Sequence, residues 1–284
     1  MTAGQAIALA ILQGFSELFP ISSLGHTVLI PALLHWQIDL SSPNFLAFVV
    51  ALHLGTAAAL LVFYARDWRG IVPAFFASIV RGRFSESSEE KLAWMLLVGT
   101  IPVGLLGLFF EHEVRNLFGS PLPVAAFLAV NGIIMFFGEG LRRKQHGDPH
   151  KAYRSLDDLS FFDAIKVGLA ESLALLPGIS RSGSSIVAGL LIGLSESEAA
   201  RYSFMLATPV ILAAGLLELP RLLEPSAHAV LALSVVGGIL SAVTAYLSVA
   251  FLTRYFQTND LRPFGWYCVI AGVASFALFY SGIR

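Results

Sequence analysis

Two short segments of the chain place side chains that suit phosphate chemistry in apolar surroundings. They read Gln13-Gly-Phe-Ser-Glu17-Leu-Phe-Pro20-Ile-Ser22-Ser23-Leu-Gly25-His26 and Glu171-Ser-Leu-Ala-Leu-Leu-Pro177-Gly178-Ile-Ser180-Arg181-Ser182-Gly183-Ser184-Ser185. Aligned without a gap, Gln13 matches Glu171, Ser22 matches Ser180 and Ser23 matches Arg181. We interpret the pair as an internal repeat in which Pro and Gly interrupt apolar helices, as in broken or re-entrant membrane helices whose freed backbone lines a site.

An anion-binding pocket is the chemistry that these segments indicate first. Ser22 and Ser180 each precede a renewed apolar run, which is where a helix N-cap belongs. Two half-helices starting there would direct their first amides and positive dipole ends at one place. Arg181 adds a planar fork of donors that matches phosphate oxygens. Its alternative role is to extend to lipid headgroups, but an ionisable group inside an apolar block usually serves function.

A carboxylate beside such a pocket needs a positive partner. Gln13 and Glu17 are four residues apart and share one helix face. A Mg²⁺ or Ca²⁺ ion held by Glu17, with Gln13 or Glu171 nearby, would bridge the carboxylate to phosphate oxygens. Alternatively, Glu17 pairs with Arg181, and the two roles are compatible.

His26 is the candidate proton-transfer residue. On a helix that begins near Ser22 and Ser23, its imidazole is expected to reach a serine hydroxyl, take its proton or protonate a leaving phosphate. His53 has no matching partners in the sequence and is interpreted as a hydrogen-bonded structural residue. Four further histidines, near span ends or in loops, are expected to be solvated: His112, His146, His150 and His228.

The composition is that of an integral membrane protein. Hydrophobic residues make up 56% of the 284 residues and charged residues 13%. Six runs approach the ~20 residues that cross a bilayer as a helix. The expected spans are 44–65, 91–111, 121–141, 200–219, 227–253 and 263–282.

The apolar blocks 2–35 and 160–194, which contain the repeats, either span the bilayer or re-enter it. Pro20 with Gly25, and Pro177 with Gly178 and Gly183, disfavour a continuous helix, so we expect two re-entrant helical hairpins. Fourteen basic residues then fall on one, cytoplasmic side: Arg66, Arg69, Arg81, Arg83, Lys91, Arg142, Arg143, Lys144, Lys151, Arg154, Lys166, Arg201, Arg254 and Arg262. Three fall on the other side: Arg115, Arg221 and Arg284.

The predicted fold is one all-α polytopic domain over 1–284, with six transmembrane helices, two hairpins in an inverted-topology repeat, and both termini outside.

The two segments closely resemble the bacitracin-resistance family of undecaprenyl-pyrophosphate phosphatases, which are bacterial membrane enzymes. The first matches a motif with an acidic residue or Gln, three spacers and Glu, followed by Pro-x-Ser-Ser-x-Gly-His. The second matches Pro-Gly-x-Ser-Arg-Ser-x-x-Thr. The resemblance extends over the chain in length, in span order and in the Pro263-Phe264 start of the last helix.

This resemblance implies hydrolysis of undecaprenyl pyrophosphate to the monophosphate and phosphate, which recycles the lipid carrier of cell-wall sugars. By it, Ser22 or Ser23 is the nucleophile, His26 transfers protons, Glu17 with Gln13 holds a divalent cation (Mg²⁺ or Ca²⁺), and Arg181 binds the diphosphate. The expected substrate-binding residues are Gln13, Glu171, Ser180, Arg181, Ser182, Gly183 and Ser185. Direct attack by water is equally open. The implied partners are a polyprenyl pyrophosphate lipid and the bilayer. No nucleic-acid partner is expected, and a homodimer is compatible with the resemblance. The implied location is the bacterial inner membrane, with the site reached from the periplasmic side.

Three residues depart from the family pattern. Gln13 stands where many members have Glu, Ser185 replaces the usual Thr, and Cys268 follows Tyr267 where members often have Arg. A polyprenyl-phosphate flippase built on the same inverted repeat is the alternative function. The type 2 phosphatidic acid phosphatases fit poorly, because residues 182–195 contain no histidine.

Overall fold

The computed structural model describes residues 1–40, 42–83, 87–110, 117, 120–145, 153–222 and 228–282. Within these residues the chain forms helices and turns without a strand, and one isolated bridge joins Arg154 to Leu194. The expectations for His112, His146 and His150, and for the basic residues Arg115, Lys151 and Arg284, lie outside the described residues.

Six helices of the described chain are long and apolar enough to cross a membrane. They are α3 (Pro43–Phe63), α5 (Ser88–Phe109), α7 (Pro121–Gln145), α10 (Glu196–Leu222), α11 (His228–Tyr255) and α12 (Arg262–Tyr280). Their positions confirm the six predicted spans, with most ends shifted by only a few residues. The long charge-free runs favour helices here. A helix of ~20 apolar residues is long enough to cross the bilayer, and it pairs its backbone N–H and carbonyl groups within itself.

The outward faces of these helices are apolar as well. Large apolar side chains that are exposed to the surroundings recur along three of them: Ile101, Leu105 and Leu108 on α5, Val235, Ile239, Val243 and Leu247 on α11, and Trp266, Ile270 and Val273 on α12. A soluble protein rarely exposes so much contiguous apolar surface, whereas a lipid-facing surface does. The chain is therefore a multi-pass membrane protein.

The two repeat-bearing blocks form helical hairpins rather than long helices. The first contains α1 (Ala3–Ser16) and α2 (Ser23–Leu33), and the second contains α8 (Phe161–Glu171), the short 3₁₀ turn η2 (Ser172–Leu175) and α9 (Arg181–Leu191). At 1.5 Å per residue these helices are only about 16–21 Å long. The breaks fall at Pro20 and at Pro177-Gly178, whereas Gly25 and Gly183, which were expected to contribute to the breaks, lie inside α2 and α9.

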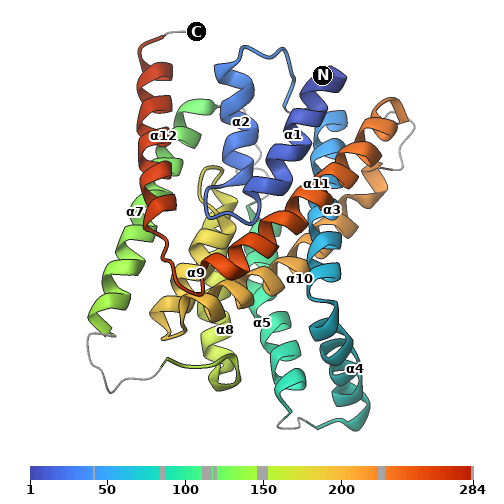
Figure 1. Ribbon diagram of the computed structural model, residues 1–284. Helices are drawn as coiled ribbons and strands as arrows, with labels where there is room; N and C mark the ends of the chain where they lie inside the picture. Colours follow the sequence, from blue (N-terminus) through green and yellow to red (C-terminus); the bar gives the residue numbers. More distant parts are fainter. Residues whose placement is uncertain are drawn as a thin grey trace.

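The hairpins enter the molecule from opposite ends (Figure 1). The N-terminal end of α1 and the C-terminal end of α2 lie at the upper end in this view, as do the start of α3 and the end of α12. The second hairpin begins at the lower end, where α8 starts and toward which α9 returns. The C-terminal ends of α4 (Ala65–Arg81) and α7 and the start of α5 also lie at the lower end.

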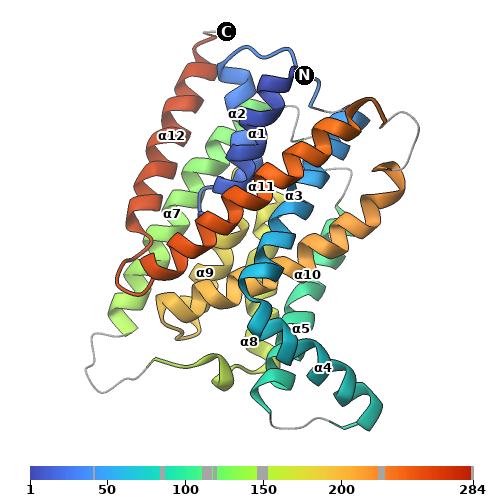
Figure 2. The same cartoon turned by 45° about the vertical axis from the view of Figure 1, so that its right-hand side comes forward.

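One helix was not predicted. Residues Ala65–Arg81 form α4, which continues from α3 after a bend at Tyr64 to the lower end of the molecule and packs against α5 (Figure 2). This stretch was expected to be a loop between the first two spans, with Arg66, Arg69 and Arg81 among its charges. The helix is amphipathic, with Ile71 buried and Phe76 exposed, so its pattern favours a surface helix rather than a span.

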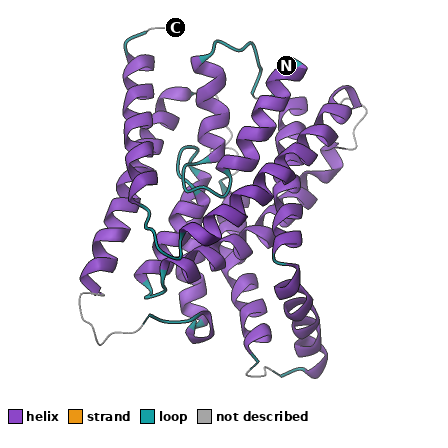
Figure 3. Cartoon of the chain, in the orientation of Figure 1, coloured by secondary structure: helices purple, strands orange, loops and turns teal. Residues whose placement is uncertain are grey.

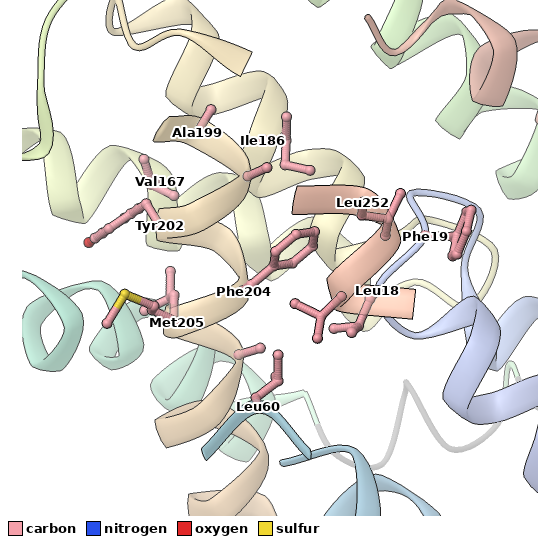
Figure 4. Close-up of a cluster of buried hydrophobic side chains, with 14 of the residues drawn as sticks. Leu18, Phe19, Leu60, Val167, Ile186, Ala199, Tyr202, Phe204, Met205 and Leu252 are labelled. Atoms are coloured by element: carbon pink, nitrogen blue, oxygen red, sulfur yellow. The ribbon is translucent and has the colours of Figure 1, made fainter. Parts of the chain in front are cut away.

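The core surrounds α10, which packs against α9, α3 and α5. Figure 4 shows side chains of this core converging from five helices and the first turn: Leu18 and Phe19 before α2, Leu60 on α3, Val167 on α8, Ile186 on α9, Ala199, Tyr202, Phe204 and Met205 on α10, and Leu252 on α11. Elsewhere small residues let helices approach closely: a Cβ at Gly55 of α3 would lie 2.1 Å from the carbonyl oxygen of Gly238 on α11. The packed helices form the scaffold that holds the turns of the two hairpins in place.

Candidate active site

The turns of the two hairpins meet in the middle of the molecule, where Figure 3 shows their loops together. The hydroxyl of Ser22 accepts a hydrogen bond from the backbone N–H of Gly178 at 3.2 Å. The hydroxyl of Ser182 donates to the carbonyl oxygen of Phe19, also at 3.2 Å. A Cβ at Gly25 would lie 3.1 Å from Gly178 Cα, so the absence of a side chain there permits the close approach.

Both half-helices begin at the residues that the sequence predicted. Ser22 caps α2 by accepting from Gly25 N at 3.2 Å, and Ser180 caps α9 by accepting from Gly183 N at 3.2 Å. Ser22 has a φ of 68°, which is rare for a residue other than glycine and is concentrated at functional sites. The predicted N-caps are confirmed, and the two helix starts lie side by side.

Glu17 is the centre of the polar network between the turns. Its Oε2 accepts hydrogen bonds from Ser23 Oγ at 2.5 Å and from Gln13 Nε2 at 2.9 Å, and lies 3.4 Å from His53 Nε2. Its Oε1 accepts from Nε and Nη2 of Arg181, both at 3.3 Å. Glu17 is only 7% exposed, so these contacts compensate a charge removed from water.

Arg181 lies between two carboxylates. In addition to its contacts with Glu17, its Nη1 donates to Glu171 Oε1 at 3.4 Å. The predicted pairing of Glu17 with Arg181 is therefore confirmed, with Glu171 as a second partner. These contacts use three of the five N–H donors of the guanidinium, which leaves two for a ligand.

The network opens into a cavity of about 310 Å³. The polar residues of the two turns and of α3 that line it are Glu17, Ser22, Ser23, His53, Glu171, Ser180 and Arg181, and Glu218 of α10 lines it as well. Its apolar wall comes from α3, α5, η2 and α10, and includes Val49, Val50, Val103, Leu175, Val210 and Ile211. A cavity with donors at one side and an apolar wall at the other suits an amphiphile whose anionic head carries a hydrocarbon chain.

Four of the predicted binding residues do not line this cavity. Gln13 is almost fully buried and orients Glu17 through its amide. Ser182 and Gly183 hold Ser180 and the first turn in place. Ser185 bonds to the carbonyl oxygen of Arg181 at 2.8 Å and to the hydroxyl of Ser203 at 2.6 Å. In this arrangement they support the residues that face the cavity.

The two candidate histidines lie differently from the expectation. The ring of His26 contacts the carbonyl oxygen of Ser22 through Nδ1 and the hydroxyl of Tyr267 through Nε2, both at 2.7 Å. It does not line the cavity, and no described hydrogen bond joins it to a serine hydroxyl. His53 was interpreted as a hydrogen-bonded structural residue, and its Nδ1 does contact the carbonyl oxygen of Val49 at 2.9 Å. However, α3 also brings its Nε2 to Glu17 and its ring into the cavity wall, which was not expected.

Three residues that the structure places at or behind the site were missed by the sequence analysis. They are His53, Tyr267 and Asn131, a fully buried residue of α7 that bonds to both turns. The available signal was a polar or ionisable side chain inside a predicted span, which is costly in lipid and usually has a partner. That signal identifies the residue but not the partner, which depends on how the helices pack.

A divalent cation fits the donors of the cavity if the substrate supplies further ligands. Within the described residues, no three His, Cys, Asp or Glu side chains are grouped to hold a metal ion by themselves. However, Glu171 is fully buried and its Oε2 has no hydrogen-bond partner. Together with Glu17 it offers carboxylate oxygens of the kind that Mg²⁺ uses alongside phosphate oxygens and water.

The fold and the site define a polytopic all-helical membrane protein with a buried carboxylate–guanidinium site at the meeting point of two broken helices. The family model described as bacitracin resistance protein BacA matches residues 6–274, so the chain belongs to this family. It is 50% identical to an undecaprenyl-diphosphatase of Mycolicibacterium paratuberculosis, over 95% of each chain. It is also 47% identical to undecaprenyl-diphosphatase 2 of Chromobacterium violaceum, over 96% of this chain and 97% of that one. Undecaprenyl-diphosphatase 1 of Burkholderia pseudomallei is 47% identical, over 94% of this chain and 93% of that one.

Proposed function

We propose that the protein hydrolyses undecaprenyl pyrophosphate to undecaprenyl phosphate and inorganic phosphate, and thereby recycles the lipid carrier of cell-wall synthesis. Relatives that carry the name undecaprenyl-diphosphatase match at 47–50% identity over nearly the whole chain. The structural observation that supports the proposal is the joint placement of Ser23, Glu17 and Arg181 at the polar side of a cavity whose other wall is apolar.

In the proposed mechanism, Ser23 attacks the terminal phosphorus while Glu17 Oε2 accepts the hydroxyl proton. The bond from that phosphorus to the bridging oxygen breaks, and undecaprenyl phosphate leaves. Water then hydrolyses the phosphoserine and releases inorganic phosphate. Arg181 and the first amides of α2 and α9 stabilise charge on the phosphoryl oxygens, which is the main requirement of phosphoryl transfer.

The role of the other candidates follows from their positions. Direct attack by water would use the same Glu17 carboxylate as base, with Ser23 orienting the water. Proton transfer by His26 and attack by Ser22 stay predictions; the described contacts favour Glu17 as the proton acceptor because it is the group bonded to Ser23. Glu17 and Glu171 are the residues that would hold a divalent cation, which when bound would neutralise charge on the diphosphate.

We further propose that the two hairpins re-enter the membrane in inverted topology, with the basic end of the molecule cytoplasmic and the site reached from the periplasmic side of the inner membrane. The opposite entry of the hairpins in Figure 1 and the distribution of Lys and Arg along the sequence support this orientation. Single cysteines at the exposed residues Gln37 and Ser155, in a Cys268→Ser background, should label oppositely with an impermeant thiol reagent. Labelling of both from outside would contradict the inverted arrangement.

The alternative function, a polyprenyl-phosphate flippase, has less support because the relatives carry the name of a diphosphatase. Purified protein in detergent should release inorganic phosphate from undecaprenyl pyrophosphate, whereas a flippase would release none. A homodimer stays a prediction, which light scattering of the detergent-purified protein tests.

A further inference from the structure

Asn131 connects the two turns through its two polar atoms. It lies on α7, is 0% exposed, and belongs to neither repeat. Its Nδ2 donates to the carbonyl oxygen of Pro20 at 3.0 Å, and its Oδ1 accepts from the backbone N–H of Ser180 at 3.0 Å. One side chain therefore bonds to the turn that follows Glu17 and to the turn that precedes Arg181.

The carbonyl of Pro20 and the N–H of Ser180, which Asn131 pairs, lie where the two helices break. A broken helix leaves carbonyl and N–H groups without helical partners, and inside a membrane protein such groups must find partners in the protein. Pro20 O has a second, weaker partner in Cys268 Sγ at 3.7 Å, to which Asn131 Nδ2 is also close, at 3.4 Å. Asn131 is the stronger donor of the two, since a thiol donates weakly.

The helix that carries Asn131 also forms the wall behind the second turn. A Cβ at Gly178 would lie 2.4 Å from the carbonyl oxygen of Val124, two helical turns before Asn131. A Cβ at Gly183 would lie 3.2 Å from Asn131 Oδ1. The second turn therefore rests directly on α7, and Asn131 extends that contact to the first turn.

We propose that Asn131 is a positioning residue that sets the separation between Ser23 with Glu17 on one turn and Arg181 on the other. The inference rests on the proposed phosphatase function for its consequence in catalysis. Asn131 does not line the cavity, so it acts through Pro20 and Ser180 and not on the substrate. A displacement of about 1 Å between reacting groups lowers rates by roughly 10²-fold, so a change in this separation affects turnover more than binding.

Two substitutions test the inference. Asn131→Asp keeps the acceptor for Ser180 N but faces the Pro20 carbonyl oxygen with an oxygen instead of a donor. Asn131→Leu removes both bonds at similar volume. With undecaprenyl pyrophosphate as substrate, we expect kcat to fall by about 10- to 100-fold in both variants, with KM within about threefold of the parent.

A matched control is Ser241→Ala. Ser241 is equally buried and bonds α11 to α3 through Leu52 O at 2.9 Å and Thr56 Oγ1 at 3.2 Å, but contacts neither turn. It should lose thermal stability and retain the kcat of the parent. Equal loss of kcat in Ser241→Ala, or an Asn131→Asp variant with the kcat of the parent, would overturn the inference.

Hydrogen–deuterium exchange gives a readout that does not depend on the assigned reaction. Amides of 17–24 and 176–184 should exchange faster in both Asn131 variants than in the parent and in Ser241→Ala, because the bond to Ser180 N or to Pro20 O is lost. A parent that releases no phosphate would contradict the proposed function, and the exchange pattern would still decide the role of Asn131. Unchanged exchange in both turns of the folded variants would refute it.

Discussion

Ser23 Oγ donates a 2.5 Å hydrogen bond to Glu17 Oε2 within the turn of the first hairpin. The bond brings a hydroxyl and a carboxylate of two buried residues together at the wall of the cavity. A hydroxyl is a weak nucleophile unless a base accepts its proton, and Glu17 is placed to do so. Helical spacing, the neighbouring serines and the family resemblance predicted that His26 takes this proton, whereas the geometry of the turn assigns the contact to Glu17.

Ser23→Ala is therefore expected to lower kcat by at least about 10²-fold, because it removes both the nucleophile and its bond to the base. Phosphate release from undecaprenyl pyrophosphate measures the effect. Ser16→Ala is the control, since Ser16 is also buried but bonds only to Leu12 O of its own helix. If Ser23→Ala stays within a few-fold of the parent, water attacks directly and Ser23 is dispensable.

His53 offers a second test of the same carboxylate. His53→Leu removes an imidazole whose Nε2 lies 3.4 Å from Glu17 Oε2 and pairs with it when the ring is protonated. A partner of a charged group contributes about 1.5–3 kcal/mol, so kcat should fall by roughly 10-fold or more. His53→Gln, which can still donate, should lose less. A His53→Leu variant with parental kcat would show that the contact has no catalytic consequence.

The same assay separates the two histidines. His26 bonds to Tyr267, so a purely positioning role predicts that Tyr267→Phe reproduces much of the loss seen in His26→Leu. Proton transfer by His26 predicts a far larger loss in His26→Leu, by about 10²-fold or more, than in Tyr267→Phe.

Hydropathy and turn chemistry account for what could be predicted from the sequence. The six spans follow from long charge-free runs, and the caps at Ser22 and Ser180 follow from a hydroxyl placed between a break and an apolar run. Both signals are local, so they need no knowledge of packing. The pairing of Glu17 with Arg181 was also accessible, because two opposite charges in apolar segments require partners.

The contacts that were missed are tertiary. His53 meets Glu17 because α3 packs beside the first hairpin, and Asn131 meets Pro20 and Ser180 across sequence separations of 111 and 49 residues. Nothing in the local pattern of α3 or α7 specifies these partners. The helix α4 was missed for a different reason. Its charged residues are typical of a loop between spans, and only the helical periodicity of its apolar side chains indicates a helix.

The cation proposal predicts that EDTA abolishes phosphate release and that Mg²⁺ or Ca²⁺ restores it. Glu17→Gln should remove activity or raise the concentration of cation required, because the amide is a poorer ligand than the carboxylate. Gln13→Ala should lose less, since Gln13 supplies one of three donors near Glu17 Oε2 and does not line the cavity. An unchanged rate in EDTA would leave Glu17 as the base and as the partner of Arg181, without a metal.

Arg181→Lys distinguishes phosphate binding from simple charge neutralisation. The guanidinium contacts Glu17 and Glu171 through three nitrogens and retains two N–H donors for a phosphoryl group. Lysine keeps the charge but lacks the planar fork, so it cannot hold both carboxylates and donate to the phosphate in the same geometry. Removing one preorganised donor typically lowers kcat by about 10²- to 10³-fold, and we expect at least that loss in protein that inserts normally.

Arg201→Lys is the matched control for this substitution. Arg201 also pairs with a carboxylate, Asp67, through one nitrogen at 2.6 Å, but it is more than one third exposed and lies outside the cavity. A single exposed ion pair contributes little and tolerates lysine, so phosphate release should stay near that of the parent. If Arg181→Lys is as active as Arg201→Lys at matched protein level, the fork has no role in catalysis, and the charge alone, paired with Glu17 and Glu171, explains why an arginine is buried there.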